Sequence, residues 1–270
     1  MDLTQKHSRR TALKTGLAAA AAATLVVPGA EAQQSRQGNI ITEWVPKKPG
    51  ELRISAICGD DNVIRSGVIG VTRNLPNSTL WWAADTRPVT PEMLNSTDLL
   101  ITYYSSYIYD EENTKVIIDN ITNGRMGWIA LHNTPWFTRG SLSDLLGVDC
   151  ALHREIQPVI VSNLNQNHPI TKGIEPTVIN LDEQFGLFLR KPDDPGLTIL
   201  FKSQGVHDKQ WTIQGVATQR GKGRTVTFTP GHYNWTYVNE ACLEILSRSA
   251  NWVLNMPITT SQVNYENYIW

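Results

Sequence analysis

The sequence predicts an α/β domain built on a doubly wound, mostly parallel sheet. Apolar strand-like segments alternate with helix-like segments along the first half of the chain, as in parallel strands joined by crossover helices. Residues 126–131 are almost wholly apolar, which is typical of a strand covered on both faces. Residues 240–254 carry their apolar side chains on one stripe, which predicts a helix packed on such a sheet.

The first half contains four predicted strands and two predicted helices. The strands are expected at residues 52–58, 79–84, 98–104 and 126–131. One helix is expected over residues 63–75. The other begins at Asp110, where two acidic residues follow in the first turn, and ends at Gly124.

The second half is richer in predicted strands. These are expected at residues 156–161, 177–181, 197–202, 216–218 and 224–229. We assign residues 51–257 to one domain, because a chain of this length can bury a single large core. Residues 33–50 are polar and contain prolines, which indicates a linker or N-terminal arm, and residues 258–270 form a polar and aromatic tail.

The N-terminal segment, residues 1–32, is typical of a twin-arginine signal peptide. Arg9 and Arg10 precede a short apolar run, and Ala30-Glu31-Ala32 forms a small-residue cleavage site. The apolar run is shorter than the ~20 residues that span a bilayer. We therefore expect export to the periplasm or the extracellular space, cleavage after Ala32, and a mature chain without stable membrane insertion.

Charge and cysteine content exclude several classes of function. Removing the signal takes away four basic and two acidic residues, so the mature chain carries 20 basic and 23 acidic residues. A net charge of −3 is no footprint for nucleic acid, and no nucleic-acid partner is expected. The three cysteines are widely spaced without a C-x-x-C motif, which predicts buried thiols rather than a cysteine metal site: Cys58, Cys150 and Cys242.

Candidate functional residues lie at the ends of predicted strands. His132 follows the apolar strand at residues 126–131, His232 follows the strand at 224–229, and Glu183 follows the strand at 177–181. His153 lies shortly before another strand. Residues beyond the carboxyl ends of parallel strands gather at one rim, so we expect these side chains to share a ligand.

Two kinds of chemistry fit imidazole and carboxylate groups at one site. His132, His153, Glu183 and His232 could hold a divalent metal such as zinc with an open coordination position. Alternatively, His132, Glu183 and His232 could act as catalytic groups that exchange protons with a sugar hydroxyl or with an α-carbon beside a keto group.

Several short motifs together resemble the ThuA-like (trehalose-utilisation) family, a branch of the class I glutamine amidotransferase-like fold. The motifs occur in the family's order over about residues 52–255, and they are Leu131-His132-Asn133, His168-Pro169-Ile170-Thr171-Lys172-Gly173-Ile174, Asp182-Glu183-Gln184-Phe185, Gly221-Lys222-Gly223-Arg224, Gly231-His232 and Asn251-Trp252. The resemblance implies a flavodoxin-like fold and a role in carbohydrate metabolism on trehalose or related oxidised glycosides, with a small-molecule sugar as the partner. It does not identify a protein partner.

The chain departs from the glutaminases of this fold and from its own family. His132 stands where a glutaminase has its cysteine, and none of the three cysteines has G-x-C-x-G surroundings, so glutamine hydrolysis through a thioester is not expected. Family members often have a histidine after the first strand, whereas this chain has acidic residues, and Asp60 is a candidate for that role. Tyr103, Trp136 and Trp235 are candidates for stacking on a sugar.

Two functions follow from these expectations. The first is an enzyme that acts on a sugar or glycoside as a lyase, hydrolase or isomerase. The second is a non-catalytic module of the same fold that binds carbohydrate or a protein partner.

Overall fold

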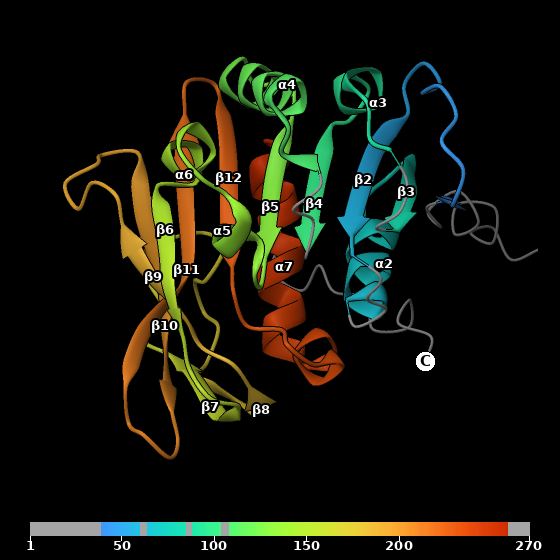
Figure 1. Cartoon of the computed structure of the whole chain (residues 1–270). Coiled ribbons are helices and arrows are strands. Elements are labelled where there is room, and N and C mark those ends of the chain that lie inside the picture. The colour runs from blue at the N-terminus through green and yellow to red at the C-terminus, as the bar shows by residue number, and fades with distance from the viewer. Residues whose placement is uncertain (1–38, 60–63, 85–87, 104–107, 259–270) are drawn as a thin grey trace, which may run out of the picture.

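The structure, a computed structural model, describes residues 39–59, 64–84, 88–103 and 108–258. Twelve strands form one mixed sheet, in which the continuous path runs β1-β3-β2-β4-β5-β12-β11-β10-β7-β8 and the pair β6–β9 joins at β11 (Figure 1). The mixed α/β domain expected from the sequence is therefore present.

One half of the sheet is parallel. Its six strands are β1 (Asn39–Ile41), β3 (Ser78–Ala84), β2 (Leu52–Cys58), β4 (Leu99–Tyr103), β5 (Gly127–Leu131) and β12 (Gly223–Phe228). All four strands predicted in the first half are found here. The short β1 lies within the expected N-terminal arm and pairs with β3 at the edge of the sheet. Since the strands are parallel, their carboxyl ends share one edge.

The other half of the sheet is antiparallel, which the sequence did not predict. Its strands are β11 (Trp211–Arg220), β10 (Leu197–Gly205), β7 (Gln157–Ser162), β8 (Thr177–Asp182), β6 (Val148–His153) and β9 (Phe185–Leu189). β12 joins the halves, because it pairs in parallel with β5 and antiparallel with β11.

Helices cover both faces of the parallel strands (Figure 1). α2 (Arg65–Arg73) and α7 (Glu240–Val253) pack on one face, and α3 (Pro91–Asn95), α4 (Glu111–Thr122) and α6 (Ser141–Leu146) pack on the other. Successive strand residues alternate between the two faces. In β5, for example, Ile129 belongs to the α7 side and Ala130 to the α4 side.

Helix ends follow the local sequence signals. The carboxylate of Asp110 accepts a hydrogen bond from the Asn113 backbone N–H at 2.8 Å and caps α4, as predicted. Asn239 caps α7 in the same way through Cys242 N–H. Two short helices complete the described chain, α5 (Thr134–Phe137) and the 3₁₀ helix η2 (Asn234–Val238).

None of the helices within the described part of the chain combines the length and the apolar character needed to cross a membrane.

Candidate active site

His132 lies immediately after β5 at the edge where the parallel strands end. Its backbone has φ 46°, in the left-handed region that non-glycine residues rarely adopt, at a cost of about 1–2 kcal/mol. Two contacts hold His132 against the end of β12. Its backbone N–H donates to the carbonyl oxygen of Phe228, the last residue of β12, at 2.8 Å, and its ring Nδ1 lies 2.9 Å from the carbonyl oxygen of Thr229, the next residue. The sharp turn thereby places the imidazole at the end of β12.

The contact with Thr229 fixes the tautomer of His132. A carbonyl oxygen only accepts hydrogen bonds, so the ring proton lies on Nδ1 and the lone pair lies on Nε2. Tyr103 stacks on the ring at 5.4 Å and Phe185 meets it edge-on at 4.8 Å. Burial lowers the pKa of His132 to about 3, because desolvation outweighs the Thr229 hydrogen bond. The imidazole is therefore neutral at physiological pH.

Glu183 and His232 lie close to the free nitrogen of His132. Glu183 Oε2 is 3.9 Å from His132 Nε2, and Glu183 Oε1 is 3.2 Å from His232 Nδ1. One ligand atom from each of the three residues lies within 4.8 Å of the others. The structure thus brings these three predicted residues together, while their catalytic or metal-binding roles stay predictions.

The group can hold a cation. The 3.9 Å separation is longer than a hydrogen bond, and both facing atoms, His132 Nε2 and Glu183 Oε2, bear lone pairs. Neutral imidazole and carboxylate are ordinary zinc ligands. Exposure rises from His132 to His232, whose side chains are 3% and 33% exposed, so one side of the group is open to a ligand.

Asp182 supports the site and was not among the predicted site residues. Its buried carboxylate accepts four hydrogen bonds, from the backbone N–H groups of Gly231, His232 and Glu183 at 2.8–2.9 Å and from Thr236 Oγ1 at 2.8 Å. Burial raises the pKa of Asp182 to about 6, against the opposing effect of these hydrogen bonds. The acidic pair Asp182-Glu183 at a strand end was the sequence signal for this role.

Gly231 makes the close approach beside Asp182 possible. Its φ is 134°, and a Cβ at this position would lie 2.1 Å from the hydroxyl oxygen of Tyr237. Only glycine fits both requirements. The backbone of residues 231–232 can therefore turn both N–H groups toward one carboxylate.

His153, predicted as a fourth metal ligand, is outside the group. It is exposed, and its ring lies 5.7 Å from Phe185 and 6.0 Å from Trp136. Phe185 is therefore a neighbour of both His153 and His132. The sequence placed His153 shortly before a strand, and β7 does follow it. The residue itself ends β6, which the sequence did not predict and which pairs antiparallel with β9.

The predicted sugar-binding residues occupy different environments. Tyr103 is buried, and its ring is stacked on His132. Trp136 is half-buried beside His153, and Trp235 is 47% exposed beside Tyr233. Asp60 lies outside the described residues. Trp136 and Trp235 are thus accessible to a ligand.

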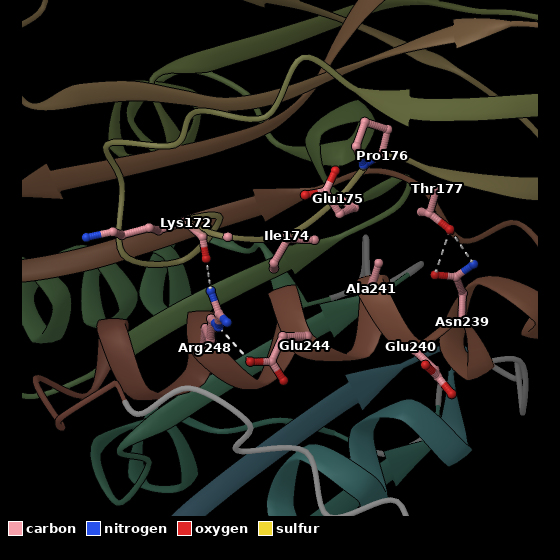
Figure 2. Close-up of a pocket in the computed structure, with 11 residues that line it drawn as sticks. Lys172, Ile174, Glu175, Pro176, Thr177, Asn239, Glu240, Ala241, Glu244 and Arg248 are labelled. Carbon is pink, nitrogen blue, oxygen red and sulfur yellow. Dashed lines mark hydrogen bonds and ion pairs between the residues drawn. The ribbon is translucent and has the colours of Figure 1, made fainter.

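A hollow of about 670 Å³ lies away from the group, between residues 172–177 and α7 (Figure 2). Two of its charged side chains, Glu244 and Arg248, are already paired with each other. Arg248 contacts Glu244 at 2.7 Å and donates to the carbonyl of Lys172 at 2.6 Å. None of the predicted site residues lines it.

Comparison with known proteins identifies similar folds. A family model described as ThuA, trehalose utilisation, matches residues 71–253. No curated protein matches the chain at a significant level. Three solved structures are similar: a ThuA-like protein from Bacteroides uniformis (16% identity, TM-score 0.54, 78% of this chain and 95% of that one), a ThuA-like protein from Parabacteroides merdae (12%, 0.60, 82% and 99%) and a cytoplasmic protein from Salmonella typhimurium (12%, 0.54, 75% and 99%).

Proposed function

The chain belongs to the ThuA (trehalose utilisation) family, and from this premise we propose that it acts on a sugar or glycoside at a divalent-metal site formed by His132, Glu183 and His232. The edge of the sheet supports this proposal. The parallel order β3-β2-β4-β5-β12 fits a flavodoxin-like, doubly wound arrangement, in which ligands bind beyond the carboxyl ends of the strands.

One observation carries the proposal: the lone pair of His132 faces a carboxylate oxygen. Thr229 O holds the proton on Nδ1, and burial keeps the ring neutral, so Nε2 has no proton to donate to Glu183. A cation between the two atoms satisfies both. Ligating histidines commonly donate their other ring N–H to a backbone carbonyl, as His132 does to Thr229.

The surrounding residues define what the site can do with a sugar. Two histidines and one glutamate leave a coordination position open, and a metal held there polarises a carbonyl or lowers the pKa of bound water. Asp182 holds the backbone of Glu183 and His232 in place. In the metal-free alternative, His232 is the most exposed of the three, and it is placed to exchange a proton with a substrate hydroxyl.

The cysteines support the proposal that the protein is not a glutaminase. All three are buried. Burial raises the pKa of Cys150 to about 11 and that of Cys242 further, so neither offers the thiolate that a thioester mechanism requires.

Metal binding tests the proposed site. We expect purified mature protein to bind one zinc ion per chain, with nitrogen ligands about 2.0–2.1 Å from the ion by X-ray absorption. Glu183→Gln keeps the side-chain shape and should weaken zinc affinity by about 100-fold or more, and His132→Ala should do the same. His168→Asn, at a half-buried histidine outside the group, is the matched control. Wild-type affinity in Glu183→Gln would refute the site.

Sugar binding separates the two functions kept open by the sequence. Metal-loaded protein should bind and convert trehalose or a keto-sugar derivative. Calorimetry measures the binding, and product analysis measures the conversion. A sugar that binds without conversion would favour a non-catalytic binding module. If none of these sugars binds, a carbohydrate role is refuted.

Export is the remaining part of the proposal. Replacing Arg9 and Arg10 together by lysine should block export, because the paired arginines are what the twin-arginine route reads. Normal periplasmic accumulation of this variant, measured by fractionation, would refute the route.

A further inference from the structure

A second hollow of about 380 Å³ lies beside the candidate site, and we call it the outer pocket. Its walls come from the end of β6, the segment that leads into β7, and the turn between β10 and β11. The residues that matter here are Leu152, His153, Arg154, Ile156, His207 and Asp208.

The outer pocket shares a wall with the candidate site. Gln157, which also lines the pocket, pairs across β7 and β8 with Asp182, the residue before Glu183. Arg154 N–H donates to Gln184 O at 3.0 Å. Asp182 and Gln184, the two neighbours of Glu183 in the chain, are therefore paired with, or hydrogen-bonded to, residues of the outer pocket.

Phe185 and His153 lie next to each other between the clustered residues and the lining of the outer pocket. Phe185 contacts His132 at 4.8 Å on one side and His153 at 5.7 Å on the other. His153 itself lines the outer pocket. A ligand that is seated at the clustered residues and passes over Phe185 would reach this pocket next.

The lining suits a neutral polyhydroxylated ring. Leu152 and Ile156 are 38% and 41% exposed, and they offer apolar surface to the C–H groups of a sugar. His207 is exposed and can donate or accept a hydrogen bond. Arg154 pairs with Asp208 at 3.3 Å, so their charges offset each other. Glu155 also lines the pocket and leaves it with a negative balance, which disfavours anionic ligands.

The turn that carries His207 is held in place before any ligand arrives. Gln157 Oε1 accepts hydrogen bonds from His207 N–H at 2.9 Å and from Asp208 N–H at 3.3 Å. Asp208 Oδ1 accepts another from Gln210 N–H at 2.9 Å. A preformed polar rim lowers the ordering cost of binding.

We propose that the outer pocket binds the second ring of a disaccharide or glycoside whose first ring lies at His132, Glu183 and His232. This inference rests on the proposed carbohydrate function and adds to it a separate subsite for the second ring. It gives His153 a place in sugar binding instead of metal ligation.

Calorimetry with glucose and with a panel of trehalose, maltose and cellobiose tests the inference on metal-loaded protein. Because a neutral hydrogen bond or a modest apolar contact is lost, His207→Ala and Ile156→Ser should each weaken disaccharide binding by about 3- to 10-fold. Glucose and zinc affinities should not change. Lys209→Ala, an exposed residue of the same turn that does not line the pocket, is the matched control.

The outcomes separate the two proposals. If no sugar of the panel binds to wild-type protein, the carbohydrate function fails and the outer pocket falls with it. If a disaccharide binds and His132→Ala weakens it, but His207→Ala and Ile156→Ser change nothing or weaken glucose equally, only the outer pocket is refuted. Both variants alter exposed side chains, and thermal unfolding confirms that they fold.

Discussion

Asp182 offers the sharpest test of how the site is built. Its carboxylate is buried and accepts hydrogen bonds from four donors. Asp182→Ala removes all four acceptor contacts at once. Water can reach the partly exposed Glu183 and His232, whereas Gly231 and Thr236 are buried.

The magnitude follows from the buried donors. Each buried donor left without an acceptor costs about 1–3 kcal/mol, and the removal of a desolvated carboxylate returns part of that. We expect Asp182→Ala to lower the free energy of unfolding by roughly 3 kcal/mol. Asp182→Asn keeps one acceptor oxygen. If the NH2 group of the new side chain faces Gly231 N–H and the Thr236 hydroxyl, the hydroxyl can turn to accept a hydrogen bond from it, but Gly231 N–H is left without an acceptor. The free energy of unfolding should then fall by about 2 kcal/mol.

Thr236→Val is the matched control, because it removes one donor and leaves the carboxylate three. It should cost about 1 kcal/mol. Urea unfolding monitored by tryptophan fluorescence gives these free energies, with unchanged m-values if the native state is intact. Zinc affinity should fall in Asp182→Ala, and it should not fall in Thr236→Val, which leaves the contacts to Glu183 and His232. An Asp182→Ala protein as stable as the wild type would refute this account of the site.

Three further changes test other parts of the fold. Burial holds the pKa of His168 at about 4, so its contribution to stability is present above pH 6.5 and is lost as pH falls through 4. His168→Asn keeps an acceptor for Ile170 N–H. The loss of unfolding free energy between pH 7 and pH 4.5, measured by urea unfolding, should be smaller in this variant by roughly 1–2 kcal/mol after allowance for partial exposure. The same loss in variant and wild type would contradict the argument. Gly223→Ala would place a Cβ 1.8 Å from Ile121 O and should cost about 3 kcal/mol or more, and a wild-type melting temperature would contradict this. Single alanine replacements of the three buried cysteines should each lower the free energy of unfolding by about 1 kcal/mol and leave sugar binding intact; these are Cys58, Cys150 and Cys242. A folded variant that no longer binds sugar would indicate that a thiol takes part in the function.

The parallel half of the fold could be predicted from sequence because its signals are local. Residues 52–58 and 127–131 form apolar strands covered on both faces, and Asp110 caps the helix it was expected to begin. These patterns depend on burial and capping within one segment. They therefore survive without knowledge of the partner strands.

The antiparallel half was harder because its strands are partly exposed and irregular. β6 is buried only at alternate residues of its first half, and both β6 and β7 have shifts of register with their partners. Strand order in such a region depends on long-range pairing that periodicity does not encode. This is why β6 and β9 were missed, and with them the position of His153 at the end of β6.

The three residues of the candidate site were predicted because each follows a strand, and residues after parallel strands gather at one rim of a sheet. That reason holds for only two of them. His132 and His232 follow β5 and β12, which are neighbouring parallel strands, as expected. Glu183 follows β8, an edge strand of the antiparallel half. It reaches the two histidines because Asp182 binds the backbone of residues 231 and 232, a contact that the sequence pattern does not reveal.

The position of β12 between the two halves has a thermodynamic consequence. A cation held by His132, Glu183 and His232 would cross-link segments that follow β5, β8 and β12, so separation of the two halves would require its release. Binding would then add to global stability by mass action, about 2.7 kcal/mol when the free cation stands at 100 times its dissociation constant. The loaded protein should resist proteolysis across the whole domain, and chelation should expose it to cleavage.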